Sequence, residues 1–179
     1  MISVSEINLV GRVVEILSEM DSWCGETHIQ KTAYVAKVVE HVPFESNFVL
    51  YKHGPYSFDL NTVLNHMRSQ NILVVTPQAP YGSSYRLNEG LWAALSRAAG
   101  QRFDEYDERV RFVCSRFARK KVAELERIAT AIYVRLNFGA LNLQQQIRKL
   151  NELKPHIGLP EAQNAFSEVE AFFQGTQQG

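Results

Sequence analysis

The chain contains five histidines, whose imidazole side chains are candidates for binding a metal ion or transferring protons. They are His28, His41, His53, His66 and His156. A zinc site needs histidine, cysteine or carboxylate ligands at short, defined spacings such as HExxH or HxH. None of the five histidines has a second ligand at such a spacing, and Cys24 and Cys114 are far apart in the sequence. The pattern therefore predicts no metal site, and it indicates two reduced thiols rather than a disulfide.

Other short motifs resemble catalytic signatures but lack the context that catalysis needs. Gly82-Ser83-Ser84 is not part of the G-x-S-x-G sequence of a nucleophile elbow. Glu152-Leu153-Lys154 has the E-x-K form found in nucleases, but it ends an expected helix and has no strand or upstream acidic partner. The sequence also contains neither G-x-G-x-x-G nor G-x-x-x-x-G-K-[ST], so a nucleotide pocket is not indicated. We therefore predict a non-enzymatic protein without catalytic residues or cofactors.

Gln30, Lys31 and Tyr34 are better suited to binding than to catalysis. On a helix, Gln30 and Tyr34 lie one turn apart with Lys31 beside them, so their side chains could form a polar recognition patch. The alternative is that Tyr34 packs with its hydroxyl group at the edge of the core while Gln30 serves a helix cap. The sequence leaves both interpretations open.

Residues 51–57 form a second group with binding potential. Gly54 tolerates any φ and Pro55 fixes its own φ at about −65°, so the pair predicts a rigid turn. Such a turn could present Tyr51 and Tyr56 as aromatic anchors of the kind that dominate binding surfaces. Turn formation alone is the simpler explanation of the same residues. The partner-binding hypothesis thus involves Gln30, Lys31, Tyr34, Tyr51, Gly54, Pro55 and Tyr56.

DNA binding is the main alternative. A helix over 57–70 would present Asn61, Asn65 and Arg68, whose side chains can contact base edges, and Arg86 on a following hairpin could contact phosphate. However, the chain has 19 basic and 19 acidic residues, so its net charge gives no general attraction to a polyanion. Two arginines also give only a weak electrostatic attraction to DNA, because proteins that bind the phosphate backbone normally use several cations.

Hydrophobic periodicity predicts a mainly α fold. The expected helices span 5–20, 28–41, 57–70, 89–99, 105–137, 142–153 and 161–173, and the expected strands span 47–51, 72–76 and 84–88. The segment 105–137 contains the polar run Arg119-Lys120-Lys121, so it forms either two helices or one bent helix. The same periodicity predicts five buried core residues, which are Leu64, Met67, Leu125, Ile132 and Phe166.

Capping residues mark several expected helix ends. Ser57 and Asn142 are suited to N-caps, and Asn71 is suited to a left-handed residue after a helix. Thr27 and Gln30 have the T-x-x-Q spacing of a capping box.

The expected elements suggest how the chain is organised. A helix followed by a β-hairpin predicts a winged-helix-like part within residues 1–100, and a helical part over 101–173 packs on it in one compact domain. Residues 174–179 are expected to form a frayed tail. No apolar run approaches the ~20 residues that a membrane span needs, and the amino terminus lacks the pattern of a signal peptide. We therefore expect a cytoplasmic protein without a membrane partner, and homo-oligomerisation stays open.

Three motifs together resemble a known family. Ile29-Gln30-Lys31-x-x-Tyr34, Tyr51-x-x-Gly54-Pro55-Tyr56-Ser57 and Leu153-Lys154-Pro155-His156 resemble the SocA-like, or Panacea, antitoxin domain and the related YwgA-like bacterial proteins. The similarity covers roughly residues 7 to 173 by pattern. The usual family strings are L-Q-K-L-x-Y-L and Y-G-P-Y or Y-G-P-V. Here Ile29 and Thr32 replace two leucines, and Lys52-His53 separates Tyr51 from the glycine.

The resemblance implies a mainly helical fold with a small winged element and a function without catalysis. Antitoxins of this family neutralise a toxin encoded next to them, by direct contact or by delivering it to a protease. We therefore expect an interaction protein that binds a protein partner, and the resemblance implies a toxin from a neighbouring gene as that partner. A winged-helix, DNA-binding transcription regulator is the alternative.

Overall fold

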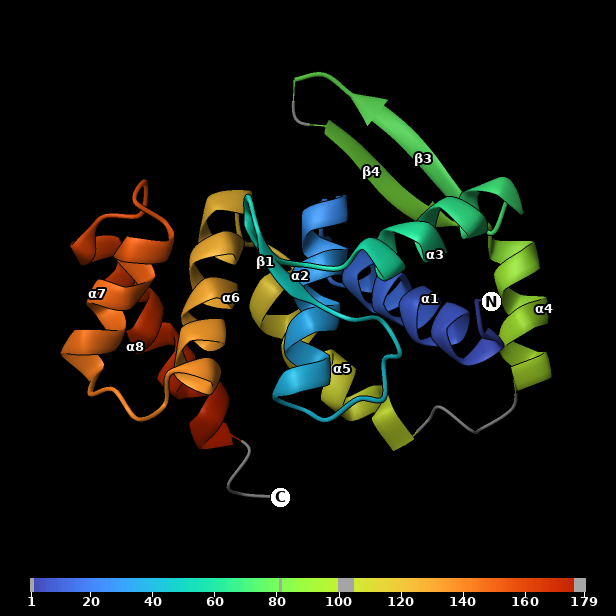
Figure 1. Cartoon of the computed structure of the whole chain (residues 1–179). Helices are drawn as coiled ribbons and strands as arrows, with labels where there is room; N and C mark the ends of the chain where they lie inside the picture. Colours follow the sequence, from blue (N-terminus) through green and yellow to red (C-terminus); the bar gives the residue numbers. More distant parts are fainter. Residues whose placement is uncertain (1, 81, 100–104, 176–179) are drawn as a thin grey trace. The chain divides into compact units, whose positions relative to one another are not determined.

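A computed structural model describes residues 2–80, 82–99 and 105–175 of the chain (Figure 1). Within these residues the fold is mainly α-helical with small antiparallel hairpins, which confirms the expected fold class. The chain divides into two compact units. The first unit comprises residues 1–48 and 57–120, and the second comprises residues 49–56 and 121–179. None of the described helices is long and apolar enough to cross a membrane.

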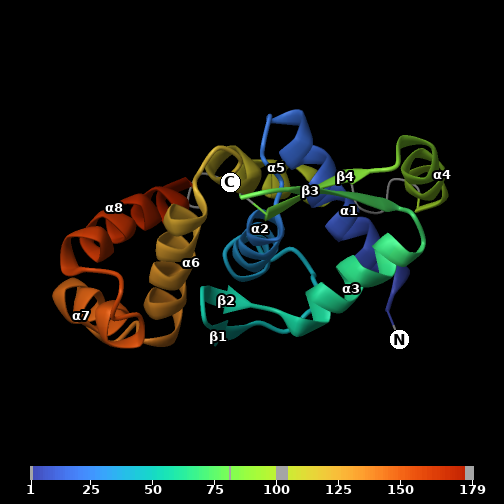
Figure 2. The same ribbon diagram turned by 90° about the horizontal axis from the view of Figure 1, so that it is seen from above.

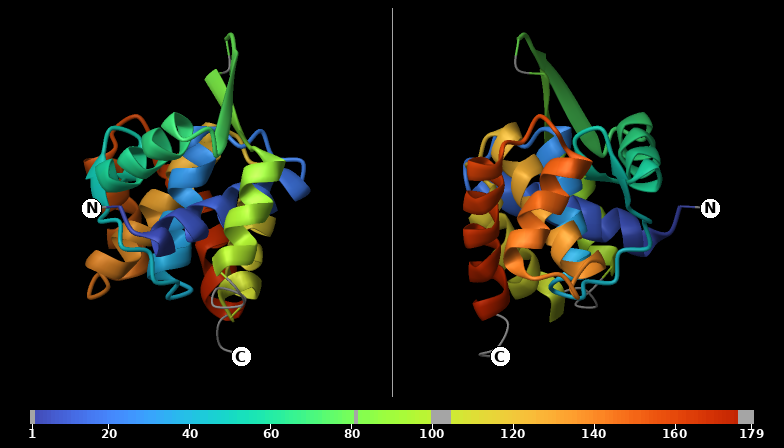
Figure 3. Two further views of the ribbon diagram at one scale, coloured as in Figure 1. Left: turned by 90° about the vertical axis from the view of Figure 1, so that its right-hand side faces the viewer. Right: turned by 60° about the vertical axis from the view of Figure 1, so that its left-hand side comes forward.

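The first unit is built around its amino-terminal helix. Its elements are α1 (Val4–Glu19), α2 (Glu26–Val38), α3 (Phe58–Ser69), β3 (Leu73–Gln78), β4 (Gly82–Leu87), α4 (Glu89–Ala99) and α5 (Asp107–Phe117). Helix α1 contacts all four other helices of the unit and also β4. The buried side chains of Leu9, Val13 and Leu17 on α1 contribute to this core. Figure 3 shows the β3–β4 hairpin projecting from these helices.

Helix α3 and the β3–β4 hairpin form largely as the sequence predicts. The Ser57 hydroxyl group accepts a hydrogen bond from the Leu60 N–H at 3.1 Å and so caps α3. Asn71 has a φ of 56°, which is the left-handed conformation expected after the helix. Strands β3 and β4 then pair in antiparallel register from Leu73↔Leu87 to Gln78↔Gly82. The winged element predicted from residues 57–88 is therefore present as a helix followed by a hairpin.

Helix α2 begins earlier than expected. Gly25 is its N-cap, Glu26 is its first residue, and no side chain caps it. The predicted capping box at Thr27 is wrong because Thr27 lies inside the first turn and the Gln30 amide bonds to Ser57 instead. Every residue from 28 to 36 is buried, so α2 is enclosed on all sides.

The second unit combines a short hairpin with three carboxy-terminal helices. Its elements are β1 (Val49–Tyr51), β2 (Gly54–Tyr56), α6 (Val122–Asn137), α7 (Leu143–Leu153) and α8 (Leu159–Gly175). Helix α6 packs against α7, α8 and β2. The expected capping box of α7 is confirmed, since Asn142 and Gln145 exchange hydrogen bonds of 3.0 Å and 2.9 Å.

The predicted core is confirmed in both units. Leu64, Met67, Leu125, Ile132 and Phe166 are each at most 1% exposed.

The segment 105–137, for which the sequence allowed two helices or one bent helix, forms two helices, α5 and α6, which are separated at residues 118–121. The two units divide between residues 120 and 121, whereas the boundary expected at 100 and 101 lies outside the described residues. Helix α8 includes Gln174 and Gly175, and positions 176–179 of the expected tail also lie outside the described residues.

Candidate functional site

The segment with the Gly-Pro pair forms a tight antiparallel hairpin (Figure 2). Its register pairs Val49 with Tyr56, Leu50 with Pro55 and Tyr51 with Gly54. Lys52 and His53 are therefore the two turn residues, and Gly54-Pro55 begins the second strand. The sequence predicts β1 but not β2, because glycine and proline are depleted in strands.

Gly54 fits closely against α6 where the turn meets β2. Its φ of 82° lies in the region that only glycine adopts readily. A Cβ atom at this position would lie 2.7 Å from the Thr130 Oγ1 atom and 3.4 Å from the Glu126 main-chain oxygen. Glycine is therefore required both by the backbone conformation and by the close approach of the hairpin to α6.

Lys154 fixes the backbone of the hairpin turn. It follows α7 as its C-cap residue and is only 6% exposed. Its ammonium group donates to the main-chain oxygen of Lys52 at 2.6 Å and also to that of Tyr51. Burial lowers the pKa of Lys154, and the negative charge of Glu126 opposes this shift. The Leu153-Lys154-Pro155-His156 and Tyr51-x-x-Gly54-Pro55-Tyr56 motifs thus meet in one site.

Glu126 adds side-chain contacts to the same turn. Its carboxylate, 8% exposed on α6, lies 3.0 Å from His156 Nε2 and 3.5 Å from His53 Nδ1. Among the described residues, no group of three or more histidine, cysteine or acidic side chains could hold a metal ion. Glu126 is hydrogen-bonded to His156 and lies close to His53, so its side chain links α6 to the α7–α8 connection and to the hairpin turn.

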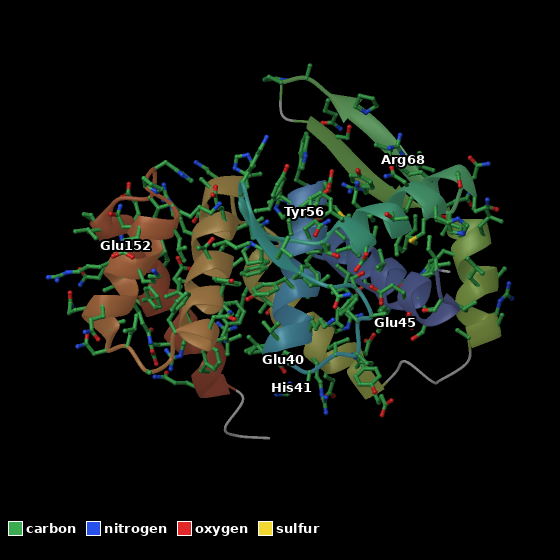
Figure 4. All side chains as sticks on the ribbon, viewed as in Figure 1. Glu40, His41, Glu45, Tyr56, Arg68 and Glu152 are labelled. Carbon is green, nitrogen blue, oxygen red and sulfur yellow. The ribbon has the colours of Figure 1, made fainter. Side chains whose placement is uncertain are left out.

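The hairpin presents apolar and aromatic surface. Val49 is 48% exposed and Tyr51 is 43% exposed, and the two residues share one face because strand side chains alternate. The ring of Tyr51 lies 5.8 Å from that of Tyr56, measured between centroids, and the Lys52 ammonium group lies 5.9 Å from the Tyr51 centroid. Tyr56, labelled in Figure 4, is half-buried at the end of β2. An exposed aromatic residue is thus displayed on a backbone that Lys154 and Gly54 hold in place.

Gln30, Lys31 and Tyr34 lie in the first unit and present almost no surface. They are 1%, 2% and 3% exposed. The Gln30 amide donates to the Ser57 main-chain oxygen at 3.0 Å and accepts from the Ser57 N–H at 2.9 Å. The Tyr34 ring packs on Phe48 with 5.4 Å between centroids. These contacts match the packing interpretation for Tyr34 and show that Gln30 holds the start of α3. The seven predicted binding residues therefore divide between the units, three in the first and four in the second.

The residues of the DNA-binding alternative differ in their accessibility. On α3, Asn61 is half-buried, while Asn65 and Arg68 are exposed. Arg68, labelled in Figure 4, lies 3.5 Å from the Asn65 side-chain oxygen. Arg86 on β4 is also exposed, and its guanidinium group donates to main-chain oxygens, to that of Tyr85 at 2.9 Å and to those of Trp23 and Ser22 at 3.5 Å and 3.4 Å. Most of the hydrogen-bonding capacity of Arg86 is therefore used within the protein.

The two cysteines are buried free thiols in the first unit. Burial raises the pKa of Cys24 to about 12, and it also raises the pKa of Cys114. Because the thiolate is the reactive form of cysteine, neither side chain is suited to nucleophilic chemistry at neutral pH.

Sequence reasoning missed the residues that hold the hairpin in place. Glu126, Thr130 and Lys154 belong to no local motif with the hairpin and contact it only through the fold. The one sequence signal was the family string that contains Lys154. No protein-family model matches the chain, and no curated protein matches its sequence. The resemblance to SocA-like antitoxins therefore rests on the three motifs.

Proposed function

We propose that this protein is a non-catalytic, antitoxin-like interaction protein that binds a protein partner through the β1–β2 hairpin. The observation that carries the proposal is the exposed Tyr51 ring at the end of β1, where the main-chain oxygens of Tyr51 and Lys52 accept hydrogen bonds from the buried Lys154. The proposed setting is the cytoplasm of a bacterium, as the resemblance implies.

A fixed hairpin is a favourable place for a binding residue. Binding normally costs free energy because side chains and loops lose conformational freedom in the complex. Here Lys154 restrains the turn backbone, and the contact of Gly54 with α6 restrains the beginning of β2. The cost of ordering Tyr51 against a partner is therefore small, and tyrosine is among the residues that contribute most to interface stability.

The motifs of the family resemblance support the same surface. Tyr51 and Pro55 come from one motif and Lys154 from another, and both lie in the second unit. A turn that served only to connect β1 to β2 would not need an exposed aromatic residue. In SocA-like antitoxins these strings recur in proteins that neutralise a toxin from a neighbouring gene, so we propose such a toxin as the partner.

Co-expression with the product of the neighbouring gene tests this function. We expect the wild-type chain to restore growth and to co-purify with that product. The Tyr51→Ala variant should lose both properties because it removes the proposed anchor. Leu91→Ala is the matched control, since Leu91 is 42% exposed on α4 of the other unit and should be dispensable. Growth rescue by a folded Tyr51→Ala variant at the wild-type level would contradict the proposal.

A further inference from the structure

We infer that the partner binds as an extended segment that adds a strand to the free edge of β1. The inference rests on the proposed function and gives it a binding mode. In strand addition, an extended peptide pairs with the unpaired main-chain groups of an exposed strand, and pockets for alternate side chains give specificity.

The hydrogen-bond pattern of the hairpin leaves the main-chain N–H and C=O groups of Leu50 without a partner in β2. In an antiparallel pair, opposed residues alternate between those that exchange hydrogen bonds and those that do not. Pro55 has no N–H group, so Leu50↔Pro55 is a non-bonded pair and the flanking pairs are the bonded ones. The N–H and C=O groups of Leu50 therefore point away from β2. Within the part of the chain that the structure describes, neither group has a hydrogen-bond partner.

The two strands differ in their capacity to accept another strand. Strand β2 packs against α6, and its outward position is occupied by Pro55, which cannot donate a hydrogen bond. Strand β1 offers both a donor and an acceptor at Leu50. An edge with unpaired N–H and C=O groups is a template for pairing with another chain.

The side chains beside Leu50 indicate what the added segment carries. Val49 and Tyr51 flank it on the exposed face at 48% and 43% exposure. Aromatic–aromatic and aromatic–β-branched pairs are among the cross-strand pairs that stabilise a sheet. We therefore assign the partner a short extended segment with valine, isoleucine or an aromatic residue at alternate positions. Because only Leu50 offers both main-chain groups, contacts with Val49 and Tyr51 determine much of the affinity.

The Leu50→Pro variant tests strand addition to β1 separately from other ways of binding the hairpin. It removes the outward N–H of Leu50, which the hairpin does not use, and proline is tolerated at such an edge position. Leu50→Ala is the control, because it shortens the side chain but keeps the N–H. The probes are the full-length product of the neighbouring gene and short overlapping peptides that cover its sequence. We expect one peptide to bind, and we expect Leu50→Pro to weaken its binding by about tenfold while Leu50→Ala has a much smaller effect.

A second measurement does not depend on how well the proline variant folds. The bound peptide is resynthesised with an N-methyl group at successive residues, and methylation of the residue that donates to the Leu50 carbonyl should abolish binding to the wild-type chain. Equal binding of all methylated peptides, or no binding by any peptide, would overturn strand addition.

The outcomes separate this inference from the proposed function. If the full-length product binds and Tyr51→Ala abolishes binding while Leu50→Pro does not, the proposed function stands and strand addition is wrong. If neither variant affects binding, the hairpin is not the surface and both proposals are wrong. If the chain alone sediments as a dimer that Leu50→Pro dissociates, the edge is occupied by a second copy and strand addition by the partner is overturned.

Discussion

The ammonium group of Lys154 lies 2.6 Å from the main-chain oxygen of Lys52, so the end of α7 holds the turn of the β1–β2 hairpin. A buried cation normally needs an anionic partner or several hydrogen bonds. Here the carbonyl oxygens of Tyr51 and Lys52 meet much of that need, and the charge of Glu126 also favours the ammonium form. The hairpin is therefore an integral part of the second unit.

Replacing Lys154 by methionine should destabilise the protein. The variant keeps the apolar stem but removes the hydrogen bonds to both turn carbonyls, and hydrogen bonds to charged groups contribute about 1.5–3 kcal/mol. Urea unfolding measures the loss. Lys149→Met is the control, because the Lys149 ion pair with Glu152 lies at the surface and contributes less than about 1 kcal/mol. Equal losses in the two variants would show that Lys154 does not hold the hairpin.

Alanine at Gly54 should be more harmful than alanine at Gly82. Both glycines have positive φ, 82° and 89°, so both variants incur the cost of a left-handed residue, about 1–2 kcal/mol. Only Gly54 is enclosed, since a Cβ there meets Thr130 at 2.7 Å whereas nothing lies within 4 Å at Gly82. Overpacking should add about 1–3 kcal/mol at Gly54. The additional Thr130→Ala substitution should recover part of that difference in unfolding free energy.

His28 should make the protein sensitive to mild acid. Its ring is 3% exposed, its Nε2 lies 3.0 Å from the Lys120 main-chain oxygen, and burial lowers its pKa from 6.5. The unfolded chain therefore binds a proton at higher pH than the folded one. The stabilisation from the neutral ring is complete above pH 6.5 and is lost as the pH falls from there through the folded pKa.

Urea unfolding at pH 7 and at pH 5 measures this dependence. The urea midpoint of the wild-type protein should be lower at pH 5 than at pH 7. This decrease should be smaller in His28→Gln, because glutamine is not protonated in this range. The variant is expected to be less stable at both pH values because it packs less well. An identical pH dependence in the two proteins would remove His28 as the cause.

DNA binding should be weak at physiological salt. The net charge is zero, and the expected recognition surface offers only two exposed arginines, of which Arg86 already donates to three main-chain oxygens of its own chain. Fluorescence anisotropy with the upstream region of the gene measures this binding. Submicromolar affinity that falls steeply with salt and is lost on Arg68→Glu would favour a transcription regulator instead.

Local sequence signals predicted the elements but not the contacts that join them. Ser57, Asn71 and Asn142 act within a few residues of themselves, so their types were sufficient to predict helix ends. The strand character of Gly54 depends instead on the close surface of α6, and the role of Lys154 depends on a turn far away in the sequence. The exposed Tyr51 was predicted as an anchor, whereas the burial of Lys31 was not, because a lysine on a helix is normally at the surface.

Calorimetric titration of the neighbouring gene's product tests the central claim, binding through Tyr51, most directly. The account predicts that Tyr51→Ala weakens binding by at least about 30-fold, the effect of losing about 2 kcal/mol at a central interface residue. Leu91→Ala, which removes a side chain of similar exposure, should change the dissociation constant by less than about twofold. If Tyr51→Ala keeps the wild-type melting temperature and binds the product with wild-type affinity, the hairpin is not the binding site.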